Sequence, residues 1–242
     1  MTAAAPGPVI QPAKIAWGLP DALLCWIAGY LGAMVASGLL FAVVRTTELD
    51  TRLLFGVLLP AQQFTVVLAV IYVSRLKGQK SLAADFGFII RLRDAKALVV
   101  GATLEIVLTL VLLPILRLDP KAQHQQLLTD LDEHRDLGTV LLFCIGAIVL
   151  APLVEELLFR GVLLRALLRK VQPVTAVLAS SVIFALVHLL GDPNTLPFLP
   201  ALTGLGAVLA VVALRSGDLS LSIFIHAGFN LTTTIFFLTL GT

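Results

Sequence analysis

The sequence is poor in charged residues. Asp, Glu, Lys and Arg make up 13% of its 242 residues, whereas a soluble domain carries about 25%. Hydrophobic residues make up 58% of the chain and come in blocks of about 20, the length that crosses the hydrocarbon core of a bilayer. A large soluble domain is therefore excluded. We predict an all-α protein, a polytopic transmembrane helical bundle, because a helix satisfies its own backbone hydrogen bonds inside lipid.

Cysteine is almost absent, which excludes a disulfide framework. Cys25 and Cys144 both lie in apolar blocks and have neither metal-type spacing nor a nucleophile motif beside them. We therefore do not expect a thiol mechanism. The net charge is only +2, and no nucleic-acid partner is expected. The partner that the composition predicts is membrane lipid.

Seven apolar segments are long enough to span a membrane. They cover about residues 20–44, 53–74, 95–116, 137–159, 173–190, 197–214 and 219–240. The fourth should continue as helix to Lys170, and an eighth short or re-entrant segment is compatible with the sequence. Residues 1–19 are predicted to be a flexible tail, so the transmembrane domain covers 20–242. No cleaved signal peptide is expected, because the first apolar segment is too long and no basic start precedes it.

Basic residues gather in alternate loops between these segments. They are Arg75, Lys77, Lys80, Arg91, Arg93, Lys96, Arg165, Arg169, Lys170 and Arg215. The loop between the third and fourth segments is acidic instead. Because basic loops stay in the cytoplasm, we predict a multi-pass cell-membrane protein with a cytoplasmic N-terminus and a C-terminus outside.

Three charged residues interrupt the fourth apolar segment, in the stretch APLVEELLFRGVLLR. A charge at the centre of a spanning helix costs about 2.5–3.5 kcal/mol, so these side chains should face the bundle interior or a wet cavity. Glu156 and Arg160 are four residues apart and can pair on one helix face. Glu155 then has no local partner, and Pro152 just before it predicts a kink. The alternative is that these charges merely mark the end of the helix.

Two histidines lie in or beside apolar segments. His188 stands one helical turn after Phe184, and His226 one turn before Asn230. A single intramembrane histidine is more often a hydrogen-bonded core residue than a catalyst. Two histidines, an asparagine and a carboxylate on different helices of one bundle favour a shared site, because polar groups in lipid need partners.

Such a site can hydrolyse a peptide bond. A carboxylate and an imidazole can activate water, and we assign these roles to Glu155 and His188. A second imidazole and an amide can donate to an oxyanion, and these roles fall to His226 and Asn230. No cofactor is needed for this chemistry. The alternative is a metalloprotease in which Glu155, His188 and His226 hold zinc with an open position for water.

Glu105 also lies within an apolar segment, the third, and belongs to none of these motifs. It is predicted to line the cavity, to pair with Arg160 or a histidine, or to be a neutral hydrogen-bonded side chain. A proton-coupled transporter that uses Glu105 in a relay is a further alternative. No inverted repeat supports it.

Three motifs stand in order on three predicted helices: Glu155-Glu156-x-x-x-Arg160, Phe184-x-x-x-His188 and His226-x-x-x-Asn230. Together they resemble the motif set of the CPBP family, which includes the type II CAAX prenyl endopeptidases and the abortive-infection (bacteriocin-immunity) proteins. The resemblance covers the C-terminal half of the chain.

The resemblance implies an intramembrane endopeptidase of the glutamate type that acts on a membrane-associated protein or peptide, with its catalytic core at about 137–240. It implies that Glu155 is the general base, His188 its partner, and His226 and Asn230 the oxyanion donors. Glu156, Arg160 and Phe184 then have supporting roles. The small size and short loops favour a bacterial plasma-membrane protein. The alternative within this family is a non-catalytic immunity or scaffold protein.

Overall fold

All secondary structure in the described part of the chain is helical. A computed structural model describes residues 16–44, 51–116 and 136–240. Seven of its helical segments are long and apolar enough to cross a membrane, which confirms the predicted bundle of seven spans and a multi-pass membrane protein. The described residues add no eighth spanning helix. Most of the predicted N-terminal tail and of the acidic loop lies outside the described residues.

The first three spans include one uninterrupted helix and two composite ones. They consist of α1 (Leu19–Val44), then α2 (Thr51–Leu53), η1 (Leu54–Leu58) and α3 (Leu59–Lys77), and finally η2 (Leu92–Ala97) with α5 (Leu98–Leu116). A short helix, α4 (Leu82–Phe86), precedes η2. The η1 segment is a π-helix and η2 is a 3₁₀-helix.

The fourth span is a continuous rod of five helical segments. It consists of α7 (Leu137–Cys144), η3 (Ile145–Leu150), α8 (Ala151–Glu155), η4 (Glu156–Leu164) and α9 (Arg165–Leu168). We call this segment, residues 137–168, the central rod. The predicted continuation of the fourth span as helix is thus confirmed, although the helix ends at Leu168 and a turn follows at residues 169–170. Both η3 and η4 are π-helices, a wide form that occurs mostly as single turns and often at functional sites.

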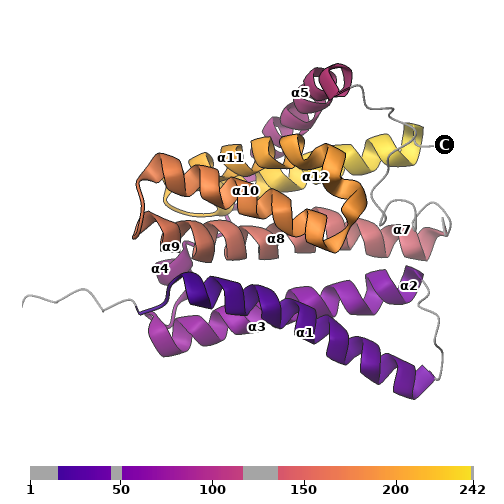
Figure 1. The fold of residues 1–242 in the computed structure, drawn as a ribbon. Coiled ribbons are helices and arrows are strands. Elements are labelled where there is room, and N and C mark those ends of the chain that lie inside the picture. The colour runs from indigo at the N-terminus through magenta and orange to yellow at the C-terminus, as the bar shows by residue number, and fades with distance from the viewer. Residues whose placement is uncertain (1–15, 45–50, 117–135, 241–242) are drawn as a thin grey trace, which may run out of the picture.

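The last three spans lie on the other side of the central rod from the first two. They are α10 (Pro173–Gly191), η5 (Pro193–Phe198) with α11 (Leu199–Ser216), and α12 (Ser220–Leu240). Three helix pairs make the largest contacts: α1 with α3, α10 with α11, and α12 with α5. In Figure 1, the central rod runs between the α1–α3 pair below it and α10–α12 above it.

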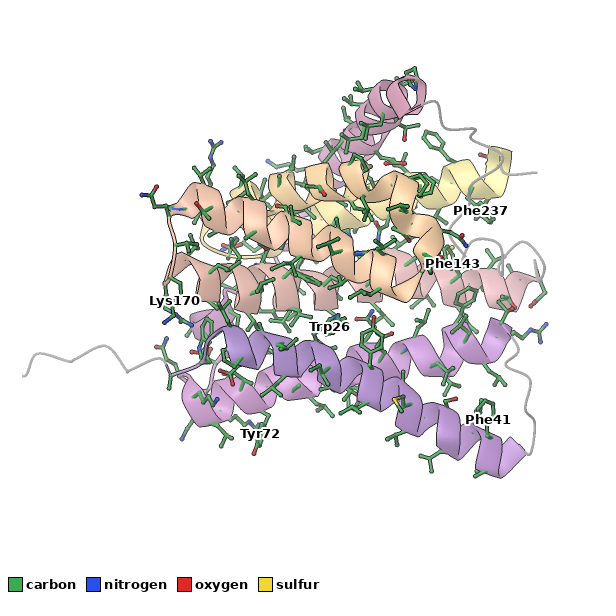
Figure 2. All side chains as sticks on the ribbon, in the orientation of Figure 1. Trp26, Phe41, Tyr72, Phe143, Lys170 and Phe237 are labelled. Carbon is green, nitrogen blue, oxygen red and sulfur yellow. The ribbon has the colours of Figure 1, made fainter. Side chains whose placement is uncertain are left out.

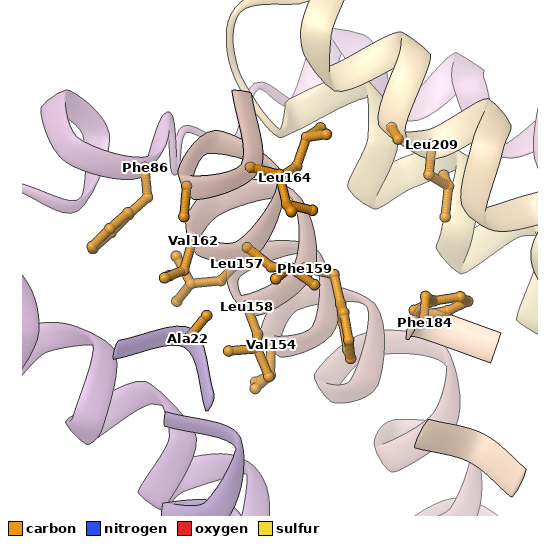
Figure 3. Packing of buried hydrophobic residues seen from close by; sticks show 14 of the residues in the cluster. Ala22, Phe86, Val154, Leu157, Leu158, Phe159, Val162, Leu164, Phe184 and Leu209 are labelled. Atoms are coloured by element: carbon orange, nitrogen blue, oxygen red, sulfur yellow. The ribbon is translucent and has the colours of Figure 1, made fainter. Parts of the chain in front are cut away.

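The core of the bundle surrounds the central rod. Every residue of η4 is buried, and its apolar side chains radiate toward Ala22, Phe86, Phe184 and Leu209 of four other helices (Figure 3). The outer helices instead carry exposed apolar side chains. Figure 2 shows Tyr72 on the outer face of α3, whereas Trp26 lies between α1 and the rod. A helix buried on all sides is what the centre of a membrane bundle requires, and η4 occupies that place.

The α5–α12 pair depends on two glycines. A Cβ atom at Gly101 would overlap the backbone of Ile225, and one at Gly228 would overlap the backbone of Leu98. Small residues let transmembrane helices approach this closely. The contact fixes α12, the helix that carries His226 and Asn230, against α5.

The start of α12 lies inside the bundle rather than at its surface. Ser220 is fully buried, and its hydroxyl accepts the backbone N–H of Arg91 at 2.9 Å. The backbone N–H of Leu219 donates to the carbonyl of Gly87 at 2.9 Å, and Asp218 pairs with the Arg91 guanidinium at 2.6 Å. The segment 82–97 therefore covers the beginning of α12. Counting residues from the start of its apolar segment places His226 only about 10 Å into the span. Because α12 begins inside the bundle, His226 nevertheless lies at the same depth as the other site residues.

Candidate active site

The four residues predicted to be catalytic line one cavity. It has a volume of about 530 Å³ and lies between the α1–α3 pair and the remaining helices. Glu155 comes from α8, His188 from α10, and His226 and Asn230 from α12. The sequence expectation that these side chains surround a shared hollow thus agrees with their positions. Phe184 also lines the cavity.

Both imidazole rings direct Nε2 toward the same carboxylate oxygen. Oε2 of Glu155 lies 3.7 Å from Nε2 of His226 and 3.9 Å from Nε2 of His188. Both distances are too long for direct hydrogen bonds. They suit groups that share one bridging water molecule. The side chain of Glu155 keeps 22% of its surface exposed, so it remains accessible from the cavity.

The other nitrogen of each ring is already engaged. Nδ1 of His188 lies 2.7 Å from the carbonyl oxygen of Phe184, and Nδ1 of His226 lies 3.0 Å from Oε1 of Glu156. Carbonyl and carboxylate oxygens only accept, so Nδ1 carries the hydrogen in both rings. When the rings are neutral, each Nε2 therefore presents a lone pair to Glu155.

Glu156 and Arg160 form the predicted pair, and it is completely buried. Nη1 of Arg160 donates to Oε1 of Glu156 at 2.9 Å, and both side chains have zero exposure. The guanidinium also donates to the carbonyl of Gly206 at 3.2 Å and stacks 4.4 Å from the ring centre of Phe184. Because the same Oε1 accepts from His226, this pair fixes the His226 ring. The alternative that these charges mark a helix end is wrong.

Asn230 is held by an unpaired carbonyl of the central rod. Its Nδ2 donates to the carbonyl oxygen of Ala147 at 2.8 Å. In this stretch the backbone follows the π pattern, since the N–H of Ala151 donates to the carbonyl of Gly146, five residues earlier. The next bond in the pattern would run from residue 152 to Ala147, but Pro152 has no N–H. In a regular α-helix Pro152 would leave the carbonyl of Ile148 without a donor, four residues earlier. The π register moves the free carbonyl to Ala147, where Asn230 of α12 donates to it.

The predicted zinc alternative gains no support from the geometry. No group of three or more His, Cys, Asp or Glu side chains among residues 16–44, 51–116 and 136–240 is arranged to hold a metal ion. The donor types Glu155, His188 and His226 match a catalytic zinc site, and each histidine donates from Nδ1 as zinc ligands do. The distances from Oε2 of Glu155 to the two Nε2 atoms, 3.7 and 3.9 Å, are longer than the roughly 3.4 Å between neighbouring ligands of a tetrahedral zinc ion.

Glu105 does not join the site. It does not line the cavity, and Thr109, one turn along the same helix, donates to its Oε1 at 3.3 Å. The predicted pairing with Arg160 is wrong, because Glu156 engages that guanidinium. The position of Glu105 agrees with the remaining prediction, that it is a hydrogen-bonded side chain within the bundle.

Two polar residues of the cavity wall were not predicted to belong to the site. Gln62 and Gln63 of α3 both line it, whereas their sequence context favours hydrogen bonds between helices. The signal that could have placed them is spacing: Leu59, Gln62, Gln63 and Val66 share one helix face, and that face meets the cavity.

Comparison with known proteins agrees with this geometry. Residues 137–232 match the family model described as type II CAAX prenyl endopeptidase Rce1-like. These residues, somewhat less than half of the chain, are similar to that family. No curated protein and no solved structure matches the chain. The Rce1-like region includes the central rod and runs into α12, so it contains Glu155, His188, His226 and Asn230. The family is a protease family, which agrees with the expected enzyme class.

Proposed function

We propose that this protein is an intramembrane endopeptidase that hydrolyses a peptide bond of a membrane-associated protein or peptide, with Glu155 as the base that activates water. The observation that carries the proposal is the convergence of two imidazole Nε2 atoms on Oε2 of Glu155, at 3.7 and 3.9 Å, inside a cavity of a multi-pass membrane protein. The Rce1-like match supports the same reaction class.

In this mechanism a water molecule sits between Glu155 and His188. The carboxylate takes one proton from the water as the water oxygen attacks the carbonyl carbon of the scissile bond. The lone pair of His188 Nε2 accepts the second hydrogen of the same water. The hydrogen bond from His188 Nδ1 to Phe184 keeps that lone pair directed at the water.

The attack leaves a negative charge on the former carbonyl oxygen. Asn230 has a second amide hydrogen beside the one it donates to Ala147, and it can donate this to the oxyanion. His226 donates from Nε2 when its ring carries a proton on both nitrogens. The carboxylates of Glu156 and Glu155, at 3.0 and 3.7 Å, balance that charge. The C–N bond then breaks, and the proton on Glu155 passes to the leaving amine.

The wall of the cavity favours an apolar substrate segment. Apart from the catalytic groups and a few other polar side chains, it is lined by aliphatic and aromatic residues of the spanning helices. Such a wall suits a substrate that enters from the bilayer. We place the enzyme in the bacterial plasma membrane, with membrane lipid and its substrate as partners.

The test compares protein termini in membranes of cells that carry the wild type or Glu155→Gln. We expect cleaved termini that occur only with the wild type, while the variant reaches the membrane at the same level. Identical termini with both proteins would contradict the proposal. If a cellular protection or partner-binding phenotype survives in Glu155→Gln, the protein is instead a non-catalytic immunity or scaffold protein.

The proposed mechanism uses no metal. Cleavage by the purified protein in detergent should therefore persist after extended treatment with a strong chelator. Activity that disappears with the chelator and returns with zinc would favour the metalloprotease alternative, with Glu155, His188 and His226 as the ligands.

A further inference from the structure

Two glutamine side chains face the cavity from the α1–α3 pair. Gln62 and Gln63 lie on the face of α3 that also presents Leu59 and Val66 to the cavity. Besides the indole N–H of Trp26 and the hydroxyl of Tyr30, their amides are the polar side-chain groups that the described residues of this helix pair contribute to the wall.

Among the described residues, neither amide has a hydrogen-bond partner. The hydrogen bonds of the described residues include none from or to the side chain of Gln62 or Gln63, although both residues are half-buried. By contrast Thr65, on the same helix, donates to the carbonyl of Ala61 at 2.7 Å. Neither amide is among the fully buried unpaired groups, so both open to the cavity. A ligand that excludes water there must complete their hydrogen bonds, because an unpaired amide in apolar surroundings is costly.

The position of Gln62 depends on a glycine of the neighbouring helix. A Cβ atom at Gly29 of α1 would lie 3.3 Å from Cγ of Gln62 and 2.7 Å from Cγ2 of Val66. The missing side chain lets α1 pack closely against the stem of Gln62, so the stem is fixed while its amide reaches the cavity. The Gln62 side chain is therefore held in place by packing, unlike that of a mobile surface residue.

We propose that Gln62 and Gln63 form a subsite that hydrogen-bonds the backbone of the substrate peptide beside the scissile bond. A carboxamide offers two N–H donors and one carbonyl acceptor, which matches the N–H and C=O of an extended peptide. The glutamines come from α3, and Glu155, His188 and His226 from α8, α10 and α12. A peptide in the cavity therefore lies between the subsite and the catalytic groups. The inference rests on the proposed proteolytic function.

The first experiment measures steady-state kinetics and thermal unfolding of Gln62→Met and Gln63→Met. The probe is an internally quenched peptide that spans the cleavage site found by the comparison of termini. We expect KM to rise about threefold to tenfold for each variant, the effect of one lost hydrogen bond, with kcat nearly unchanged. The midpoint of thermal unfolding should not fall, because no hydrogen bond within the protein is lost.

The matched control is Phe64→Leu. Phe64 is the next residue of α3, is 62% exposed and does not line the cavity, so its replacement should leave KM unchanged. A second series uses probe peptides with one backbone nitrogen methylated at a time. Methylation at the recognised position should raise KM for the wild type and have a smaller effect on the glutamine variant that lost the bond.

The outcomes separate this inference from the proposed function. If Glu155→Gln is inactive but both methionine variants keep the wild-type KM, the subsite is wrong and the protease proposal stands. A lowered thermal midpoint with unchanged KM would also overturn the subsite, because it identifies the glutamines as bonds between helices. If Glu155→Gln cleaves as well as the wild type, both proposals fail together.

Discussion

Glu155 and Glu156 are identical in chemistry and adjacent in sequence, yet their surroundings differ completely. Glu155 opens onto the cavity with 22% of its side chain exposed, whereas Glu156 has no exposed surface. Glu156 accepts from both Arg160 and His226. The first carboxylate is available to water and substrate, and the second is available only to its protein partners. Chemistry and structural support are therefore divided between neighbouring residues.

This division predicts opposite effects of two matched substitutions. Glu156→Gln removes the negative charge beside the buried Arg160 guanidinium and should cost about 3–5 kcal/mol of unfolding free energy. Glu155→Gln removes no such partner and should leave stability nearly unchanged, while the loss of a general base lowers turnover by about 10²–10⁴. Thermal unfolding in detergent and peptide cleavage measure the two effects.

The two variants control for each other, because both replace a carboxylate with an amide of the same size. If Glu155→Gln destabilised the protein as much as Glu156→Gln, the carboxylate of Glu155 would be a structural group. Glu156→Gln should also perturb the ring of His226, which loses its carboxylate partner.

The π-helical turn before Glu155 connects two helices of the site. Pro152 leaves the carbonyl of Ala147 without a backbone donor, and Asn230 of α12 supplies one. In Pro152→Ala the new N–H can bond to Ala147 and compete with the Asn230 amide. We expect turnover to fall about tenfold, less than the roughly 10²–10³ lost when an oxyanion donor is removed in Asn230→Ala.

The double variant distinguishes this coupling from a general loss of structure. Because Pro152 acts through Asn230, the double variant should be no slower than Asn230→Ala alone. If steady-state kinetics instead show that the loss of turnover in the double variant equals the product of the two single losses, the coupling is refuted. Pro173→Ala serves as control, since Pro173 opens α10, where a helix needs no N–H bond.

The N-terminal end of α7 gives a pH-dependent prediction. Oδ1 of Asp136 accepts the backbone N–H of Gly138 and Thr139, and Oδ2 accepts the Thr139 hydroxyl. These contacts lower the pKa of Asp136 to about 2, and the hydrogen bond from the Thr139 hydroxyl has the largest effect. The Thr139 N–H and Arg52 lower the pKa further, while burial opposes them. Because the pKa of Asp136 is lower in the folded state, its carboxylate stabilises the fold fully at a pH above the unfolded-state pKa of about 3.9. This stabilisation is lost as the pH falls through the folded-state pKa.

We therefore expect Asp136→Ala to unfold at a lower temperature than the wild type near pH 6. This difference should shrink as the pH falls from about 4 to about 2, because the wild-type carboxylate then becomes protonated and loses its capping role. Thermal midpoints measured across this range test it. A difference that persists undiminished at pH 2 would show that the charge of Asp136 is not what stabilises α7.

Individual residues show which features the sequence could predict. Hydropathy predicted the seven spans. The buried Glu156–Arg160 pair was also predictable, because a lipid-exposed charge is costly and the two residues are four apart on one helix. The motif spacing brought Glu155, His188 and His226 together. The π register around Pro152 escaped prediction, since its hydrogen-bond pattern follows from packing against α12 rather than from local residue preferences.

The depth of His226 and the placement of Gln62 were missed for a related reason. Counting residues from the apparent start of a span assumes that each helix begins at the membrane surface. Here segment 82–97 covers the start of α12. Likewise, an amide in an apolar helix indicates a need for a partner but does not say whether a neighbouring helix or a substrate supplies it. Both features depend on contacts between distant parts of the chain.

The distribution of charge over the bundle predicts how it lies in the membrane. Most basic groups of the described chain gather at the end formed by α4, α9 and the start of α12. There Arg91 pairs with Asp218, and the Arg169 guanidinium stacks 4.0 Å from the ring centre of Trp17. Arg52 and Asp136 pair at the other end, beside the start of α7, and Figure 1 shows α2 and α7 together there. By the positive-inside rule we predict that the basic end faces the cytoplasm.

Single-cysteine labelling tests this orientation. In a variant with Cys25 and Cys144 replaced by Ala, we introduce Gln79→Cys at the basic end or Leu137→Cys at the opposite end; both positions are exposed. A membrane-impermeant maleimide added to spheroplasts should label Leu137→Cys directly and Gln79→Cys only after lysis. The wild-type level of peptide cleavage in each variant verifies the fold. The reverse labelling pattern would place the N-terminus and the basic loops outside, because the seven spans carry these two positions to opposite faces of the membrane.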